Sequence, residues 1–225
     1  MQLKKIQHYI DLYRSFLETP AAQERLHLWA SQRHFQEHWN IDAPDFGQMY
    51  DQALQNPVTR RFWKREQYEP KRLMMVFCAM EPEYVRHIFK DLFKEEKDIE
   101  NRVDRFAYYC DDLLRTYKDQ HPTSVENHHY HDAAMISLYL AFQYPGVYAY
   151  YDGKAFAQLM QLLGATDIPK ADDLGRYFKT MRTLYGFLQK DPQVMALHRK
   201  RLDPRVHDMS DSMLLAWDFA LFCTA

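Results

Sequence analysis

The sequence predicts an all-α protein, an irregular domain of about ten helices with at most a short extended segment near residues 147–151. Three observations support this fold class. Only six of the 225 residues are glycine, a scarcity that helices tolerate better than sheets built on tight glycine turns. Apolar residues recur at intervals of three and four along most of the chain. Prolines stand at several positions where a helix could begin.

The first part of the chain is predicted to form three helices. Apolar spacing over residues 6–17 predicts the first, and Pro20 lies in the first turn of a second that contains Trp29. Residues 42–45 offer capping and turn chemistry before a short third helix over 46–54.

Three further prolines can each occupy a first helical turn, which predicts short helices over residues 58–65, 71–80 and 83–93. The clearest periodicity comes next. Apolar residues over 99–117 follow each other in steps of four and three, which describes one long amphipathic helix. His121 and the proline after it end this helix.

The remaining helices alternate with residues that cap or break helices. They are predicted over residues 130–142, 153–163, 172–188, 192–202 and 212–222. Asp152 can cap the second of these helices, and Gly164 can end it.

A chain of 225 residues is long enough to bury a full core. We expect helical subdomains over residues 1–122 and 123–225, or one compact domain. The last apolar run ends at Ala225 without a capping glycine or a polar tail. We therefore expect the sequence to continue into a further domain.

Composition restricts the possible partners. The net charge is −2 and the isoelectric point is about 6.6, so charge alone does not attract the chain to nucleic acid or to an anionic membrane. The first residues lack the apolar stretch of a signal peptide or a membrane span, which predicts a cytoplasmic protein. Cys78, Cys110 and Cys223 lack a C-x-x-C spacing and are expected to be inert buried thiols of a reducing compartment.

Two histidine-rich segments could carry chemistry. His34 and His38, with Glu37, fit the H-x-x-E-H pattern of inverted zinc proteases, but no third ligand is identifiable and a solvated helix face explains them equally well. In the second segment, His128, His129, His131 and Asp132 lie at the start of a helix. Metal or acid–base chemistry is conceivable there, and capping and packing is the plainer interpretation.

Complete catalytic motifs are missing from the sequence. The six glycines form neither a P-loop nor a dinucleotide-binding pattern, and no nucleophile elbow occurs. We expect this segment to be no enzyme by itself, without catalytic residues, cofactor or bound metal.

Two stretches interleave basic and aromatic residues, a pattern that can hold phosphates and stack bases. The residues predicted to contact nucleic acid are Arg60, Arg61, Lys64, Arg65, Arg199, Lys200, Arg201 and Arg205. The alternative is a solvated face with its aromatic side chains turned inward.

A tyrosine-rich loop joins two predicted helices and can form a recognition surface. Its tyrosines are Tyr144, Tyr148, Tyr150 and Tyr151. Tyrosines that fill the gap between helices are the alternative.

The order of several segments resembles the N-terminal region of bacterial McrB-like AAA+ proteins. These segments are WNIDAPDF at 39–46, PKRLM at 70–74, EPEYVR at 81–86, HD at 131–132, LYLAFQYP at 138–145, YAYY at 148–151, LHRKRL at 197–202 and LLAWDF at 214–219. The resemblance covers nearly the whole chain.

The resemblance implies a helical recognition or assembly module of a restriction or defence complex, which binds DNA or selects targets. It implies an oligomer formed through an absent nucleotide-hydrolysing AAA+ domain, and a nuclease as partner. The full-length protein would then hydrolyse nucleoside triphosphates. Two alternatives remain: a module that docks a partner subunit, and a metal-dependent hydrolase that uses His34 and His38.

Overall fold

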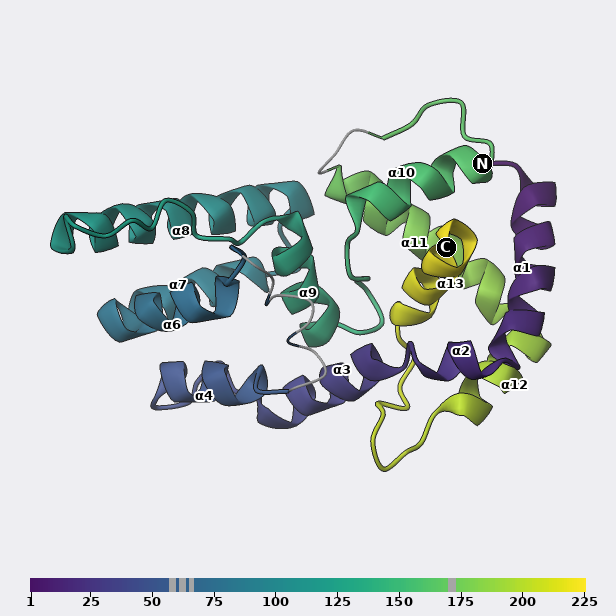
Figure 1. Cartoon of the computed structure of the whole chain (residues 1–225), viewed down its shortest axis with the longest axis horizontal. Helices are drawn as coiled ribbons and strands as arrows, with labels where there is room; N and C mark the ends of the chain where they lie inside the picture. The colour runs from purple at the N-terminus through teal and green to yellow at the C-terminus, as the bar shows by residue number, and fades with distance from the viewer. Residues whose placement is uncertain (57–59, 61–63, 65–66, 170–172) are drawn as a thin grey trace. The chain divides into compact units, whose positions relative to one another are not determined.

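The computed structural model describes residues 1–56, 60, 64, 67–169 and 173–225, and every regular element in them is a helix (Figure 1). The helices are α1 (Leu3–Leu17), α2 (Pro20–Gln23), α3 (His27–His38), α4 (Phe46–Ala53), α6 (Pro70–Met80), α7 (Pro82–Leu92), α8 (Ile99–Gln120), α9 (Ala133–Gln143), α10 (Gly153–Leu162), α11 (Leu174–Gln189), α12 (Pro192–Arg201) and α13 (Leu214–Thr224). The predicted all-α class is confirmed. Residues 147–151 form no strand.

Aspartates and prolines set many of the helix starts. The side chains of five N-cap aspartates accept hydrogen bonds from backbone N–H groups of the first turn: Asp45, Asp98, Asp152, Asp173 and Asp191. Prolines begin four helices, at Pro20, Pro70, Pro82 and Pro192. These starts agree with the predicted ones because capping depends on residues close together in sequence.

The chain divides into two compact units. Unit 1 comprises Met1–Arg33 and Ser137–Ala225, and unit 2 comprises His34–Ile136. This division differs from the predicted subdomains 1–122 and 123–225. The reason is that α1 packs on α12 and α13, a pairing of the two ends of the chain that local sequence patterns do not reveal.

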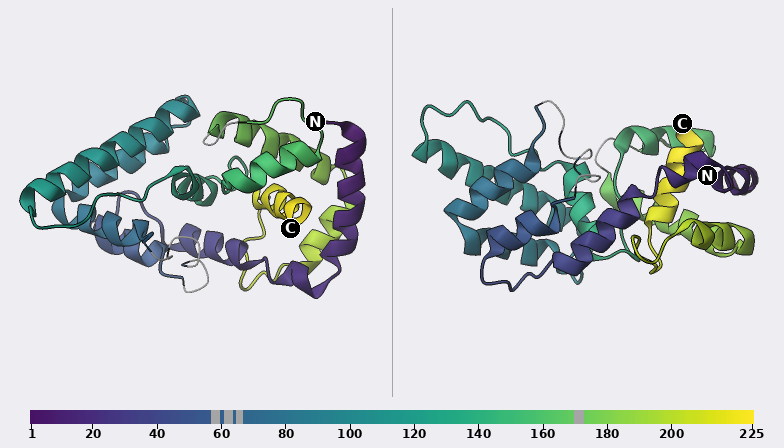
Figure 2. Two further views of the ribbon diagram at one scale, coloured as in Figure 1. Left: turned by 45° about the horizontal axis from the view of Figure 1, so that its top comes forward. Right: turned by 60° about the horizontal axis from the view of Figure 1, so that its bottom comes forward.

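Unit 1 is built around α13. This helix contacts α1, α10 and α11, while α12 packs on α1 and α11 (Figures 1 and 2). All residues from Leu214 to Ala220 are buried, Asp218 among them. A helix that is apolar on all sides needs such a central position.

Asp218 is held by a buried ionic network. Its carboxylate lies 2.7 Å from the guanidinium of Arg201, and the Tyr13 hydroxyl donates a hydrogen bond to it at 2.6 Å. The side chains of Arg201 and Asp218 are 1% and 0% exposed. Arg201 also donates to the carbonyl of Ala22 at 3.0 Å, and Arg25 lies 3.6 Å from the second carboxylate oxygen. The network therefore joins α1, α2, α12 and α13.

Replacing Asp218 by asparagine should strongly destabilise the protein. The change leaves the Arg201 charge buried without a counter-charge, which typically costs about 3–5 kcal/mol. Urea unfolding of Asp218→Asn measures this loss. Asp203→Asn is the control, because Asp203 pairs with the exposed Arg205, and such surface pairs contribute about 0–1 kcal/mol. Equal losses in the two variants would contradict the assigned role of the network.

His198 should make stability depend on pH. Burial, helped by the Arg201 charge, lowers the pKa of His198 from 6.5 to about 3. The unfolded chain takes up this proton near the ordinary value, while the folded chain does not. Stability should therefore fall as the pH drops below 6.5, by about 1.4 kcal/mol per pH unit for this group.

The measurement is the free energy of unfolding between about pH 7 and pH 5. His198→Gln should show a smaller decrease in stability over this range, because the titrating group is removed. An identical pH dependence in both proteins would show that His198 is not the buried neutral group.

Gly164 ends α10 as predicted. Its φ is +70°, the N–H of Ala165 donates to the carbonyl of Met160, and the N–H of Gly164 donates to the carbonyl of Gln161. These bonds form a Schellman motif. A Cβ atom at this position would lie 2.8 Å from the Gln2 side chain.

Gly164→Ala should therefore lower the free energy of unfolding by about 1–2 kcal/mol, because an L side chain disfavours the left-handed conformation. Thermal unfolding measures the change. Gly186→Ala is the matched control, because Gly186 lies inside α11 and a Cβ atom there would meet nothing within 4 Å. Alanine favours a helix interior, so this variant should not lose stability.

Unit 2 packs α4, α6, α7 and α8 together, with α7 and α8 side by side (Figure 2). Phe89 of α7 lies at the centre of its aromatic core. The Phe89 ring packs against those of Trp39, Phe46 and Phe106 at centroid distances of 5.2, 5.8 and 5.2 Å. No helix in the described part of the chain has the length and apolar character needed to cross a membrane.

Candidate anion-binding pocket

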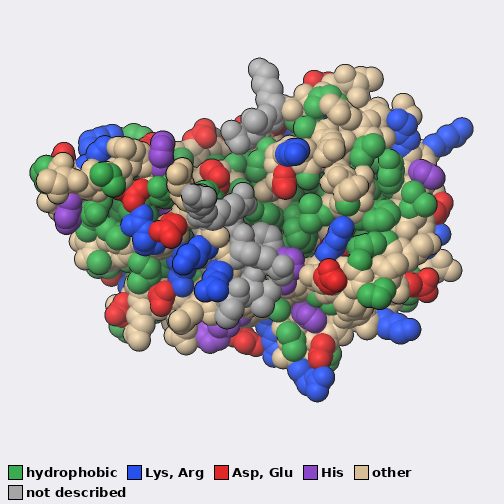
Figure 3. All heavy atoms as spheres, viewed as in Figure 1, with side chains coloured by type: hydrophobic (Ala, Val, Ile, Leu, Met, Phe, Trp, Pro, Cys, Tyr) green, Lys and Arg blue, Asp and Glu red, His purple; other side chains and the backbone are tan. Residues whose placement is uncertain are grey.

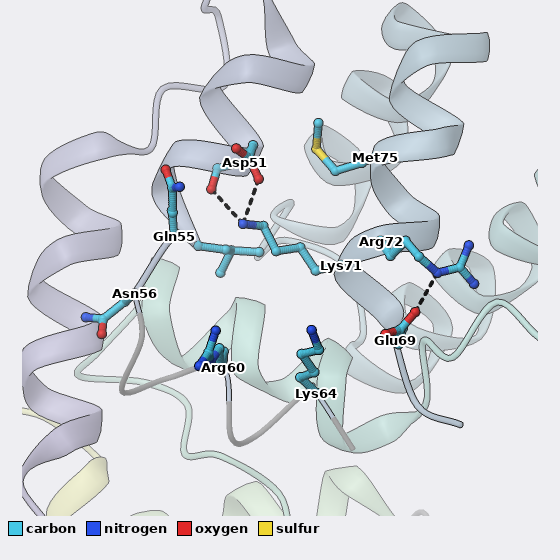
Figure 4. Close-up of a pocket in the computed structure, with 10 residues that line it drawn as sticks. Asp51, Gln55, Asn56, Arg60, Lys64, Glu69, Lys71, Arg72 and Met75 are labelled. Carbon is cyan, nitrogen blue, oxygen red and sulfur yellow. Dashed lines mark hydrogen bonds and ion pairs between the residues drawn. The ribbon is translucent and has the colours of Figure 1, made fainter. Parts of the chain in front are cut away.

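A pocket of about 490 Å³ opens in unit 2 between the end of α4 and the start of α6 (Figure 4). Four cationic and two anionic side chains line it together with polar and apolar groups. The lining residues are Asp51, Leu54, Gln55, Asn56, Arg60, Lys64, Glu69, Lys71, Arg72 and Met75.

Two of the cations are neutralised inside the pocket. The amino group of Lys71 lies 2.7 Å from the Asp51 carboxylate and donates to the Asp51 carbonyl at 2.9 Å. The guanidinium of Arg72 lies 2.6 Å from the Glu69 carboxylate and also contacts Glu126. Burial alone would raise the pKa of Glu126, but its hydrogen bonds to Tyr130 and Arg72 outweigh this effect and lower the pKa.

The other two cations have no counter-charge among the described residues. Arg60 and Lys64 are exposed, and the N–H of Lys64 donates to the carbonyl of Arg60 at 2.7 Å. Within the described part of the chain, neither side chain forms an ion pair or a hydrogen bond. Figure 4 shows both side chains pointing into the same space as Lys71.

This arrangement suits the binding of an anion. The described lining contains no Ser, Thr, Cys or His that could serve as a nucleophile or as a histidine base. Its two carboxylates pair with Lys71 and Arg72. What remains is a concave surface with two positive charges that no described residue neutralises, which suits a phosphate or carboxylate group. In Figure 3, Lys and Arg side chains gather over unit 2 with acidic groups between them.

Several sequence-predicted residues line this pocket. Arg60 and Lys64 of the first basic stretch are brought together in it. Arg61 and Arg65 lie outside the described residues. The pairing of Lys71 with Asp51 was not predicted, because it joins two helices whose packing the sequence pattern does not specify.

The second basic stretch divides between surface and core. Arg199 and Lys200 are exposed at the end of α12, and Arg205 is exposed and lies 2.8 Å from Asp203. Arg201 was predicted to contact phosphate at the surface. This prediction is wrong, because the Arg201 guanidinium is buried against Asp218. The positions 194, 198 and 201 share one buried helix face, and this spacing is the signal that identifies Arg201 as a core residue.

The tyrosine loop also needs correction. Tyr148, Tyr150 and Tyr151 are buried, and the Tyr177 hydroxyl donates to the carbonyl of Tyr150. Only Tyr144 is partly exposed among the four predicted tyrosines. These rings fill the core of unit 1, because large aromatic side chains contribute more by burial than by exposure. They do not form an exposed recognition loop.

The H-x-x-E-H segment gains no third ligand among the described residues. The rings of His34 and His38 lie 4.2 Å apart, but the Nε2 atom of His34 hydrogen-bonds to the Gln52 carbonyl and the Nδ1 atom of His38 to the His34 carbonyl. The cluster of potential metal ligands found in the described part of the chain lies elsewhere. A hydrolytic zinc site needs three protein ligands, so the hydrolase alternative gains no support.

The chain matches no protein family, no curated protein and no solved structure. Geometry and charge therefore carry the functional argument.

Proposed function

We propose that this chain is a non-catalytic recognition module that binds the phosphate groups of DNA. The observation that carries the proposal is the pocket of unit 2, in which Arg60 and Lys64 have no counter-charge among the described residues, beside the paired Lys71 and Arg72. Cationic side chains that face solvent without partners gain most from a polyanion, because binding releases the counterions condensed on it.

Unit 1 provides a second group of cations. Arg199 and Lys200 are adjacent and exposed in the last turn of α12. Arginine and lysine in this position also interact favourably with the negative end of the helix dipole. Because the helix C-terminus already interacts with these two charges, we assign them a weaker role than Arg60 and Lys64.

The setting we propose is that of the McrB-like motors whose N-terminal region the sequence resembles. The chain would then select DNA for a restriction or defence complex, with a nucleotide-hydrolysing ring and a nuclease as its partners. The features of this chain that bear on the proposal are its exposed cations and its lack of a complete catalytic motif.

The test is binding of the purified chain to labelled DNA over a salt series, with duplex and single-stranded DNA, plain and cytosine-modified. The Arg60→Ala/Lys64→Ala double variant should bind more weakly. The slope of log K against log salt should shrink by about 2, since each lost phosphate contact removes about one unit.

A matched control removes the same charge from the same unit. Arg115 and Lys118 lie near the end of α8, outside the pocket, so Arg115→Ala/Lys118→Ala should retain the full slope. Arg199→Ala/Lys200→Ala tests unit 1 separately and should show a smaller decrease. If the Arg60/Lys64 and Arg115/Lys118 variants lost DNA affinity equally, net charge alone would explain the effect. That result would contradict the pocket as the DNA contact.

The protein-docking alternative has its own outcome in this experiment. Lack of any DNA affinity at low salt would overturn the proposal and favour a partner subunit. The large apolar side chains exposed in the described residues come from separate segments of both units: Met1, Leu3, Leu12, Tyr108, Val125, Val206 and Met209.

A further inference from the structure

Three potential metal ligands converge in unit 2, and none of them lines the pocket. The Sγ atom of Cys110 and one ring nitrogen each of His129 and His131 all lie within 4.8 Å of one another. Cys110 lies in α8, and the two histidines precede α9. Cys110 and His131 are buried, with 0% and 1% exposure, and His129 is partly buried.

A tight turn brings the two imidazoles together. Tyr130, between them, has a φ of +60°, a conformation that non-glycine residues rarely adopt. The N–H of His131 donates to Nδ1 of His129 at 3.0 Å, and Nδ1 of His131 donates to the His129 carbonyl at 2.6 Å. The two rings stack with centroids 5.9 Å apart. Strained backbone of this kind is concentrated at binding and active sites.

The hydrogen bonds determine which ring atoms carry lone pairs. Because Nδ1 of His131 donates to a carbonyl, its proton is on Nδ1 and the lone pair is on Nε2. This tautomer is the one that a backbone carbonyl selects in histidines that bind metals through Nε2. Nδ1 of His129 accepts the N–H of His131, so the proton of its neutral ring is on Nε2, which lies 3.4 Å from a carboxylate oxygen of Asp111, an adjoining acid that is 63% exposed. Zinc must therefore displace either this hydrogen bond at Nδ1 or the proton at Nε2 of His129.

We propose that Cys110, His129 and His131 form a binding site for a zinc ion. One thiolate and two imidazoles are the donor types that zinc prefers, and three protein ligands leave a fourth tetrahedral position for water or for the nearby Asp111 carboxylate. The ligand atoms must move closer by rotation of their side chains, because zinc binds sulfur at about 2.3 Å and nitrogen at about 2.0–2.1 Å.

The protonation states agree with metal binding at neutral pH. Burial lowers the pKa of His129, and it lowers that of His131 to about 3, which favours the uncharged form of both rings. Burial, together with the Asp111 charge, raises the pKa of the Cys110 thiol. Zinc must therefore displace a proton from sulfur, and affinity should rise with pH.

The capping role of this segment remains intact in the proposed site. Asp132 accepts a hydrogen bond from the N–H of Met135 at 2.9 Å, which confirms the capping interpretation for that residue. His128 is not in the cluster of potential ligands. From the sequence, Cys110 is expected to be inert and no metal is expected to bind. The zinc proposal departs from this expectation because α8 places the Cys110 thiol beside both imidazoles.

Titration of the purified full chain with cobalt(II), which takes the place of zinc, tests the site. We expect one equivalent to bind with the intense charge-transfer absorption of a cobalt–thiolate bond, and zinc to displace it. Cys110→Ser should abolish that absorption. His129→Gln, at the partly exposed ligand, should weaken binding by about tenfold or more.

Cys78→Ser is the matched control, because Cys78 is another buried thiol of unit 2, in α6, outside the ligand cluster. It should keep the charge-transfer band, and circular dichroism checks that each variant is folded. Absence of stoichiometric cobalt binding to the unaltered chain, or a band that persists in Cys110→Ser, would overturn the proposal. Neither outcome decides the DNA-binding measurement, which uses different variants.

Discussion

The packing of unit 1 depends on the ion pair and hydrogen bond that hold a buried carboxylate in the middle of its most apolar helix. Asp218 is fully buried in α13, where an unpaired charge would be strongly destabilising. Its partners come from separate elements: Tyr13 from α1 and Arg201 from α12. Because each partner must reach the same carboxylate, the network fixes the positions of α1 and α12 relative to α13. Burial, helped by the same guanidinium, lowers the pKa of His198 and so keeps its imidazole neutral.

The two units use arginine in opposite ways. Arg201 is enclosed, lies against the Trp29 ring at 5.2 Å and has a full counter-charge, so it stabilises the fold and has no charge left for a ligand. Arg60 is exposed and has no counter-charge among the described residues, so its charge remains available for binding. Burial and pairing, rather than residue type, distinguish a structural cation from a binding one.

Sequence patterns predict the features that depend on residues close together in the sequence. Asp152 as a cap, Pro82 as a helix start and Gly164 as a helix end were all predictable, because each acts within one helical turn. For the basic run 198–201, composition predicts a surface, whereas helical spacing places Arg201 inside.

Contacts between distant segments were not predictable. Residues 1–33 join residues 137–225 in one unit, which no local pattern indicates. The meeting of Cys110 with His129 and His131 likewise requires α8 to pack beside the segment before α9. The tyrosines of the loop 148–151 were open to two interpretations, and burial in the core resolves them.

Glu126 connects the pocket and the histidine turn. One of its carboxylate oxygens accepts a hydrogen bond from the Tyr130 hydroxyl at 2.7 Å, and the other contacts the guanidinium of Arg72 at the pocket wall. A ligand that draws Arg72 away from Glu126 therefore acts on the strained residue between His129 and His131. Thermodynamic linkage makes any such coupling reciprocal, so occupancy at one place would alter affinity at the other by the same factor. A single glutamate thus physically connects the pocket with the proposed zinc site.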